Sequence, residues 1–306
     1  MDRKQFLHAA AAATFTSVLP KRPARGTPQD KQQQSESQLP TIDGVQLAIA
    51  SICTDGFGNQ HHEPAMKFIP QLGFKNVELN LLYPDHITPR YVSRLKQRCQ
   101  DAGLKPVSLH GIGFGAQGGK NGIVKDVAHK LLMMQYARQL DCHIVKFTGS
   151  KKGTQGGLQS IIKVCKELAP VAEEMGVLVT LENHAGNNLE SIADYETVFS
   201  QIESANIGLC LDTGHFEGAG IELKEVVERF HDRTLHVDLK DCRAFGKGHD
   251  TVPFGTGQTD FDAFLKQLIA TDYKGYLVVE QAWKEPQGDW KADLKSAAQR
   301  FKKWTK

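Results

Sequence analysis

Residues 207–215 read IGLCLDTGH, an apolar run that ends in the polar residues Asp212, Thr213 and His215. A short run rich in Ile and Leu is typical of a buried strand. A helical pattern follows at residues 221–230. The segment therefore predicts one strand–helix unit of a parallel sheet, with polar side chains at the carboxyl end of the strand.

The same strand–helix unit recurs eight times within residues 39–306. This alternation predicts an α/β fold, and eight units predict a closed (β/α)8 TIM barrel formed by a single domain. The alternative is an open doubly wound sheet, which usually carries a GxGxxG turn after its first strand. Residues 53–58, CTDGFG, lack that spacing, so the barrel is favoured. The expected strands are residues 46–51, 76–81, 105–110, 143–148, 178–183, 207–212, 234–239 and 276–280, and the expected helices are residues 63–72, 89–102, 123–140, 158–175, 191–202, 221–230, 261–270 and 289–303.

The composition is that of an ordinary globular protein. Of 306 residues, 40% are hydrophobic and 24% are charged, which excludes fibrous, mostly disordered and disulfide-dense chains. No run of about 18 apolar residues indicates a transmembrane helix. The six cysteines are widely spaced and form no Cys-x-x-Cys pair, which predicts buried thiols rather than a zinc knuckle. If the protein is exported, one disulfide stays an open alternative.

Residues 1–38 are predicted to be a signal or leader segment followed by a linker. Residues 1–19 combine a short basic start, Arg3 and Lys4, with an apolar stretch too short to span a bilayer. The local pattern resembles a bacterial twin-arginine signal in which Lys4 replaces the second Arg. We therefore expect export, to the periplasm, and a cytoplasmic location if the leader is not functional. An amphipathic start helix and a membrane tether are the alternatives, and residues 20–38 are expected to be a linker.

Removing this leader leaves 31 basic and 32 acidic residues, because residues 1–38 contain six of the 37 basic and three of the 35 acidic ones. The body of the chain therefore carries a net charge of −1. A nucleic-acid-binding protein usually carries a strong basic patch. We therefore expect no nucleic-acid partner, and no membrane contact beyond the leader.

Polar residues gather at the carboxyl ends of the later predicted strands. They are Glu182, Asn183 and His184, Asp212 and His215, His236, Asp238 and Lys240, and Glu280. In a TIM barrel these ends meet at one mouth, where active sites lie. A single carboxylate there is as well explained by a salt bridge, but four of them would repel each other unless a cation held them. An oxygen-rich set favours Mn²⁺, Mg²⁺ or Co²⁺ over a thiolate-type zinc site, with Zn²⁺ as an alternative.

Five segments carry a family resemblance, namely residues 181–184 (LENH), 211–215 (LDTGH), 236–241 (HVDLKD), 255–261 (GTGQTDF) and 275–280 (GYLVVE). Over residues 45–303 the chain resembles the xylose-isomerase-like TIM barrel superfamily, in particular its sugar phosphate isomerase/epimerase branch. The resemblance implies one divalent metal ion held by a Glu, an Asp, a His and a Glu. Glu182, Asp212 and Glu280 match three of these, whereas Asp238 stands where many relatives carry His. More distant xylose isomerases use a carboxylate on this strand, so we predict Asp238 as the fourth ligand, with His236 as the alternative.

The resemblance also implies a metal-dependent sugar isomerase or epimerase. Glu182 and Glu280 would act as base and acid, moving a proton through a metal-stabilised enediolate. His215 would hydrogen-bond a substrate oxygen, and Lys240 would neutralise an alkoxide or bind an acidic group. The alternatives are a lyase or dehydratase acting on a keto sugar or inosose, and a non-catalytic sugar-binding barrel. A DNA-repair endonuclease of the endonuclease IV type fits less well, since that type needs a His-rich three-zinc cluster and a basic face.

Other residues keep two interpretations each. His184 either contacts substrate or orients Glu182, and His110 either contacts substrate or makes a rim hydrogen bond. Glu78 and Lys146 form a polar layer inside the barrel, with a structural or a substrate role. Trp283 and Phe57 are walls against a sugar ring or packing residues. The expected partner is a small carbohydrate, and the sequence shows no interface for a homo-oligomer, which stays an open alternative.

Overall fold

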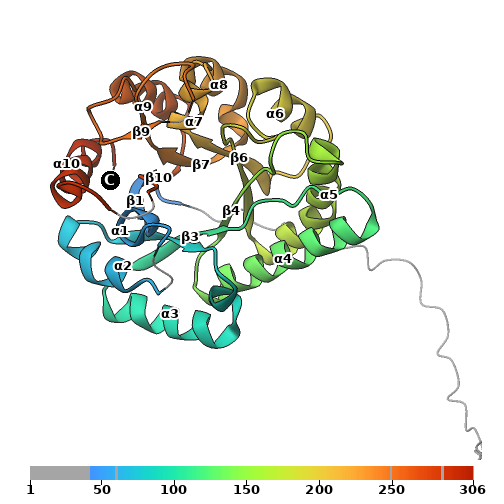
Figure 1. Ribbon diagram of the computed structural model, residues 1–306, viewed down its shortest axis with the longest axis horizontal. Coiled ribbons are helices and arrows are strands. Elements are labelled where there is room, and N and C mark those ends of the chain that lie inside the picture. Colours follow the sequence, from blue (N-terminus) through green and yellow to red (C-terminus); the bar gives the residue numbers. More distant parts are fainter. Residues whose placement is uncertain (1–41, 59–60, 249, 284–285, 306) are drawn as a thin grey trace, which may run out of the picture. The chain divides into compact units, whose positions relative to one another are not determined.

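The computed structural model describes residues 42–58, 61–248, 250–283 and 286–305. The predicted leader and linker lie outside the described residues. Within these ranges, eight parallel strands close into a barrel in the order β1-β10-β7-β6-β5-β4-β3-β2 (Figure 1). The predicted α/β barrel is therefore confirmed. Its strands are β1 (Val45–Ala50), β2 (Asn76–Leu81), β3 (Lys105–Gly111), β4 (Ile144–Thr148), β5 (Leu178–Glu182), β6 (Ile207–Asp212), β7 (Thr234–Leu239) and β10 (Gly275–Val279).

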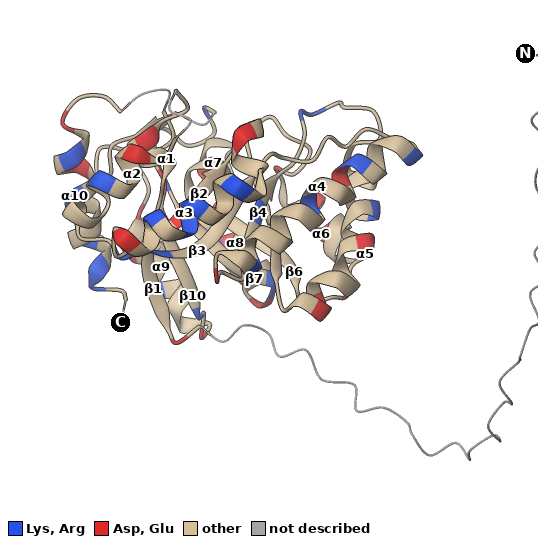
Figure 2. Ribbon diagram, turned by 90° about the horizontal axis from the view of Figure 1, so that it is seen from below, with Lys and Arg blue, Asp and Glu red and all other residues tan. Residues whose placement is uncertain are grey.

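Helices surround the barrel and bury their apolar sides against it (Figure 1). In α3, for example, Val92, Leu95 and Cys99 are buried, and the Thr88 side chain caps the helix by accepting the Tyr91 backbone N–H. Figure 2 shows acidic and basic residues interspersed over the outer helices. None of the helices in the described part of the chain is both long and apolar enough to cross a bilayer. The outer helices are α2 (Glu63–Phe68), α3 (Pro89–Asp101), α4 (Lys120–Gln139), α5 (Gly157–Met175), α6 (Ile192–Phe199), α8 (Leu223–Phe230), α9 (Phe261–Ala270) and α10 (Trp290–Lys302).

Several short helices and strands that the sequence did not predict lie between the barrel strands and the outer helices along the chain. A helix begins directly after β6, because the Asp212 side chain accepts the backbone N–H of His215 at 2.9 Å and caps its first turn. The predicted helix at 221–230 begins only at Leu223. The short elements are α1 (Ile52–Asp55), η1 (Pro70–Leu72), η2 (Pro84–Ile87), α7 (Thr213–Gly218), η3 (His231–Arg233), and the hairpin strands β8 (Asp241–Cys242) and β9 (Thr251–Val252).

The inside of the barrel is unusually polar. Layers of branched apolar side chains usually fill a TIM barrel, but here Glu78, Lys146, Thr180, His236 and Asp238 are all fully buried. Buried polar groups are costly unless they pair with one another. The predicted polar layer is therefore present, and its pairing partners shape the site above it.

All six cysteines are buried and none is in a disulfide, as predicted for buried thiols. Cys53 shows what such a thiol does: it donates to the Val279 carbonyl at 3.3 Å and accepts the Gln281 N–H at 3.1 Å. These two bonds join α1 to the last residue of β10, Val279, and to Gln281, on either side of Glu280. Burial raises the pKa of Cys53 well above its usual value, so the thiol stays protonated.

Candidate active site

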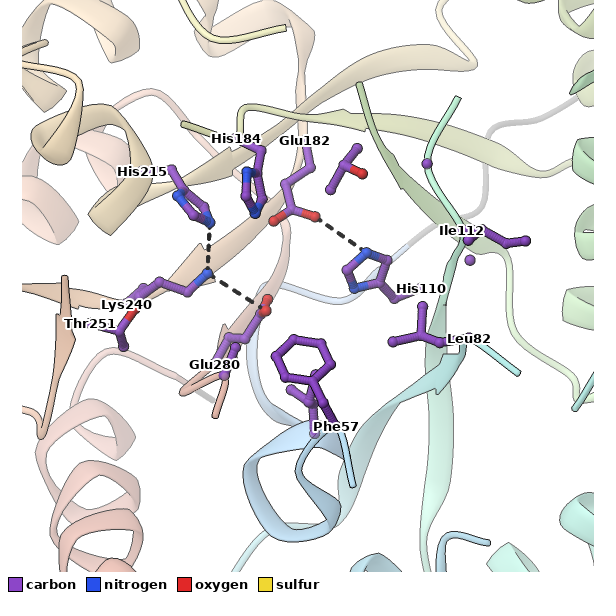
Figure 3. Close-up of a pocket in the computed structure, with 15 residues that line it drawn as sticks. Phe57, Leu82, His110, Ile112, Glu182, His184, His215, Lys240, Thr251 and Glu280 are labelled. Carbon is purple, nitrogen blue, oxygen red and sulfur yellow. Dashed lines mark hydrogen bonds and ion pairs between the residues drawn. The ribbon is translucent and has the colours of Figure 1, made fainter. Parts of the chain in front are cut away.

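A cavity of about 340 Å³ opens at the carboxyl ends of the strands (Figure 3). This is within the range of small-molecule sites. Its polar lining comprises His110, Thr148, Glu182, His184, His215, Lys240, Thr251 and Glu280. Phe57, Leu82 and Ile112 add apolar walls, and Phe57 is 48% exposed. Residues at or just after the carboxyl ends of β2, β3, β4, β5, β6, β7 and β10, together with the first strand–helix turn, therefore supply one concave surface that is partly polar and partly apolar.

His110 and Glu182 face each other across one side of the cavity, with His110 Nε2 3.6 Å from Glu182 Oε2 (Figure 3). Asn80 determines the tautomer of His110. The Asn80 carbonyl oxygen accepts from Ser51 Oγ at 2.9 Å and from the Ile52 N–H at 3.1 Å, so its amide group donates to His110 Nδ1 at 3.1 Å. Burial and the Lys146 ammonium lower the pKa of His110 to about 3. His110 is therefore neutral and points an Nε2–H donor toward Glu182.

Lys240 organises the opposite side. Its ammonium donates to Asp212 Oδ2 at 2.6 Å and to His215 Nε2 at 3.1 Å, and lies 3.6 Å from Glu280 Oε1 (Figure 3). Burial would lower the pKa of Lys240, but Asp212, Glu280 and Glu182 outweigh it and raise that pKa. Lys240 thus places a fixed positive charge beside the Glu280 carboxylate and the His215 imidazole, which both line the cavity.

Glu182 and Glu280 differ in protonation although both line the cavity. Burial raises the pKa of Glu182 to about 8, with the Glu280 charge adding to the effect. For Glu280, burial is outweighed by the ammonium groups of Lys146 and Lys240, which hold its pKa well below the usual value. At neutral pH the site therefore offers one protonated and one ionised carboxyl group, the pattern of an acid–base pair.

The predicted ligands Glu182, Asp212, Asp238 and Glu280 come together, with one oxygen from each lying within 4.8 Å of the others. Such oxygens suit hard divalent ions. Glu182 Oε2 and Asp238 Oδ1 are buried, and no hydrogen-bond donor in the described residues reaches them. These residues fit a divalent cation by donor type, by convergence and by the oxygens left without a donor.

Lys146 lies among these carboxylates. Its Nζ is 2.6 Å from Asp238 Oδ2, 2.9 Å from Glu280 Oε2 and 3.8 Å from Glu182 Oε2. It also lies 2.7 Å from Glu78 Oε1. The place of Lys146 inside the barrel was predictable from the sequence, but its contacts with three candidate metal ligands were not. The available signal was a lysine in the middle of the apolar strand 144–148.

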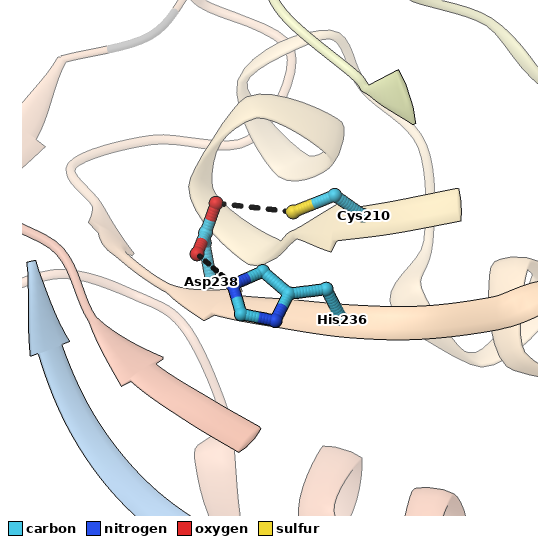
Figure 4. A group of neighbouring side chains, drawn as sticks. All are labelled: Cys210, His236 and Asp238. Atoms are coloured by element: carbon cyan, nitrogen blue, oxygen red, sulfur yellow. Dashed lines mark hydrogen bonds and ion pairs between the residues drawn. The ribbon is translucent and has the colours of Figure 1, made fainter. Parts of the chain in front are cut away.

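His236, the alternative fourth ligand, lies one layer deeper than the cavity. Its Nε2–H donates to Glu78 Oε2 at 3.0 Å and is 3.8 Å from Asp238 Oδ1. Together with Cys210 it forms a second group of ligand-type atoms around Asp238 (Figure 4). Burial keeps the pKa of Cys210 well above its usual value, so its thiol acts as a donor to Asp238 Oδ2 at 3.2 Å. Asp238, rather than His236, joins the group at the strand ends.

The remaining predicted residues divide between cavity and support. His184 lines the cavity, with its ring 4.0 Å from that of His215, centroid to centroid. Trp283 donates its indole N–H to the Cys53 carbonyl at 3.1 Å, which fastens the residues after β10 to α1. In the described part of the chain, Ala282 and Phe57 line that side of the cavity and Trp283 does not.

Similarity to known proteins identifies the family. The model of the xylose isomerase-like TIM barrel family matches residues 66–304. The chain belongs to this family. An inosose dehydratase of Histophilus somni (strain 129Pt) is 28% identical over 239 residues, which cover 68% of this chain and 78% of that protein. An inosose dehydratase of Bacillus thuringiensis (strain Al Hakam) is 31% identical over 129 residues, which cover 37% of this chain and 43% of that protein.

Solved structures of the same xylose isomerase-like fold agree with the architecture. A D-tagatose 3-epimerase-like protein superposes with a TM-score of 0.70 at 18% identity, over 84% of this chain and 97% of that one. An IolI protein with a bound zinc atom gives 0.67 at 20% identity, over 84% and 95%. At these identities the likeness shows the fold alone. The second of these structures shows that a protein of this fold can hold a zinc atom.

Proposed function

We propose that the protein is an enzyme that moves a proton at a carbon next to the carbonyl group of a small sugar, as an isomerase or epimerase. The supporting observation is the placement of Glu182 and Glu280 in one cavity, with the neutral His110 imidazole beside Glu182 and the Lys240 ammonium beside Glu280. A sugar that enters the cavity lies between an acid and a base. The mixed lining suits a compact polyhydroxylated molecule, with Phe57 as an apolar wall.

The residues divide the work as follows. Glu280 is ionised and takes the proton from carbon, while Glu182 is protonated and returns a proton to the substrate. The Lys240 ammonium, 3.6 Å from Glu280 Oε1, stabilises the negative charge that develops on the substrate oxygen. The neutral His110 donates its Nε2–H toward the same space. His215 is held by Lys240 and contacts a substrate oxygen.

A divalent ion, with Mn²⁺, Mg²⁺ or Co²⁺ preferred, would be held by Glu182, Asp212, Asp238 and Glu280, where it would polarise the substrate carbonyl. This part of the proposal rests on the four convergent oxygens.

Dehydration of a keto sugar or inosose is the second candidate. Inosose dehydratases are among the relatives of this chain, and one of them aligns over 239 residues. Dehydration begins with the same proton abstraction by Glu280. Glu182 would then donate its proton to the hydroxyl group that leaves from the next carbon, so that water and an enol form. The two candidates share the base and differ in where the acid delivers its proton.

Solvent-deuterium incorporation, followed by NMR in D₂O, tests the proposal. The full chain is incubated with ketoses, aldoses, 3-keto sugars and inososes, with and without Mn²⁺. We expect deuterium at the carbon next to the carbonyl of one substrate, and the product then separates isomerisation from loss of water. If sugars bind but none gains deuterium, proton transfer is overturned and the sugar-binding alternative replaces it.

A further inference from the structure

We propose that Lys146 is a built-in cation of the carboxylate cluster, so that a divalent ion binds only by competing with the Lys146 ammonium. The inference deepens the proposed function, because it concerns the charge that holds the same catalytic carboxylates together. It also changes the expectation for metal: the cluster forms without an ion, and the affinity for one is low.

Lys146 Nζ already lies where it neutralises the candidate ligands. It makes its shortest contacts with Asp238 Oδ2 at 2.6 Å and Glu280 Oε2 at 2.9 Å, and lies 3.8 Å from Glu182 Oε2. Three of the four candidate metal ligands therefore already share one positive charge. A metal ion bound at about 2.1 Å from the same oxygens would lie within about 5 Å of Nζ, and two cations at that distance repel strongly in a buried site.

Lys146 also has a partner, Glu78, that a metal ion bound to the four candidate ligands would not replace. Glu78 Oε1 lies 2.7 Å from Nζ, and Glu78 is outside the group of candidate ligands. Glu78 is itself fixed, since its Oε2 accepts from Ser108 Oγ at 2.8 Å and from His236 Nε2 at 3.0 Å. Moving the ammonium away would leave Glu78 buried without its cation, which is costly.

The net charge of the buried cluster also depends on Lys146. Glu78, Glu182, Asp212, Asp238 and Glu280 supply five carboxyl groups, and Lys146 and Lys240 supply two ammonium groups. With Glu182 protonated and the other four carboxyl groups ionised, the cluster carries −2, whereas without Lys146 it would carry −3. Lys146 therefore removes part of the attraction for a divalent ion and occupies oxygens that the ion would need.

A direct chemical role for Lys146 is less consistent with its place. Its side chain is fully buried, and the described residues that line the cavity include Glu182 and Glu280 but not Lys146. An amine that forms a covalent adduct must reach the substrate. Lys146 acts through the carboxylates that it holds, and it is therefore a positioning residue.

The test is the binding of Mn²⁺ to the full chain, measured by calorimetry and by the melting temperature with Mn²⁺ or EDTA. We expect weak binding and an unchanged melting temperature for the wild type. Lys146→Met should bind Mn²⁺ about tenfold more tightly or better, because a competing charge is gone. It should melt lower than wild type in EDTA and be stabilised by Mn²⁺, since binding to the folded state raises stability.

Lys130→Met is the matched control. Lys130 is as deeply buried, but its ammonium contacts the carbonyl groups of Ile112 and Gly113 instead of the carboxylate cluster. It should lower the melting temperature without improving Mn²⁺ binding. Two results overturn the proposal: wild-type protein that binds Mn²⁺ with micromolar or tighter affinity and melts lower in EDTA, or a Lys146→Met variant that binds no better than wild type.

If Lys146→Met does not fold, the Mn²⁺ affinity and the melting temperature of the wild type still test the proposal. Deuterium exchange keeps the two proposals apart. Exchange that needs no added Mn²⁺, together with weak Mn²⁺ binding, supports both. Tight Mn²⁺ binding with exchange overturns only the role of Lys146, and weak binding with no exchange in any bound sugar overturns only the enzymatic function.

Discussion

Glu280 and Glu182 contribute different steps, and single substitutions separate them. Glu280→Gln removes the base, so we expect the turnover number to fall by about 10²–10⁴-fold and deuterium incorporation to fall with it. Glu182→Gln removes the acid, so product formation should fall while deuterium exchange into the substrate persists. Steady-state kinetics and NMR exchange on the same samples measure both effects.

The substitutions are nearly isosteric, and circular dichroism checks that both variants fold. His231→Gln, in η3 directly before β7 and therefore at the opposite end of the barrel from these strand ends, serves as a substitution control and should keep wild-type exchange. Near-wild-type rates in both glutamine variants would show that these carboxylates do not carry the chemistry.

The site residues that the sequence indicated share one property, which is their position at the end of an apolar strand. Asp212 and Glu280 can be placed this way, because parallel strands of a barrel end at one mouth. Lys146 cannot, since its partners Asp238 and Glu280 are 92 and 134 residues away in sequence. Only the closed barrel shows which buried charges neutralise each other.

Helix α4 positions the loop that borders the cavity after β3. Its Asp126 carboxylate accepts the backbone N–H groups of Gly115 at 2.9 Å and Ala116 at 3.1 Å. Lys130, one turn later, donates to the carbonyl groups of Ile112 and Gly113. Since Ile112 and Gly113 line the cavity, this pair on α4 determines the shape of that wall.

Asp126→Ala should loosen this loop. Two backbone N–H groups lose their acceptor, and we expect the free energy of unfolding to fall by about 1–3 kcal/mol. The Michaelis constant should rise more than the turnover number falls, because the wall moves while Glu182 and Glu280 stay in place. Urea denaturation and steady-state kinetics measure the two effects. An unchanged Michaelis constant would show that the loop does not contact substrate, and Asp101→Ala on α3 is the exposed control.

Long secondary-structure elements with a clear hydrophobic period lie at the residues where the sequence predicts them. All eight strands and the helices with several turns lie close to their expected ranges. Helices α1 and α7 were missed, because four or six residues do not complete enough turns to show a period. Their cause is local: α7 starts where the Asp212 side chain, which ends β6, accepts the His215 N–H. Asp212 is thus both the last residue of β6, at the site, and the N-cap of α7.

At the scale of the whole molecule, the count of strand–helix units predicted closure. β1 pairs in parallel with β10, from Val45 with Gly275 to Ile49 with Val279. This pairing joins the first and last strands of the sheet and closes the barrel. The pairing could be anticipated because eight parallel strands are the number that closes this fold. The polar interior could not, since alternating charges along a strand do not reveal their cross-barrel partners.

Stability of the barrel depends on buried histidines that are neutral when folded. His62 directly precedes α2 and packs against α3 and η2, with its Nδ1 2.7 Å from the Tyr91 hydroxyl and its ring 4.8 Å from that of His86, centroid to centroid. Burial, with His86 and Arg98 adding to it, lowers the pKa of His62 to about 3. Protonating His62 in the folded state is therefore unfavourable at mild acidity.

Stability should therefore fall as the pH drops below about 6.5, the ordinary histidine pKa. Below pH 6.5 the unfolded chain binds a proton at His62, whereas the folded protein does not until the pH nears the lower pKa of His62 in the folded state. The free energy of unfolding therefore falls by up to about 1.4 kcal/mol per pH unit because of this group. His62→Asn removes the titrating group, and Asn tolerates the left-handed backbone at this position, where φ is 60°. We expect this variant to be less stable at pH 7 but to lose less stability between pH 6.5 and 4.5 than wild type, as measured by urea denaturation.

His61→Asn, at the exposed neighbour, is the control. Its free energy of unfolding should fall with decreasing pH as steeply as that of the wild type. Equal slopes in all three proteins would mean that His62 is protonated in the folded state as easily as in the unfolded chain.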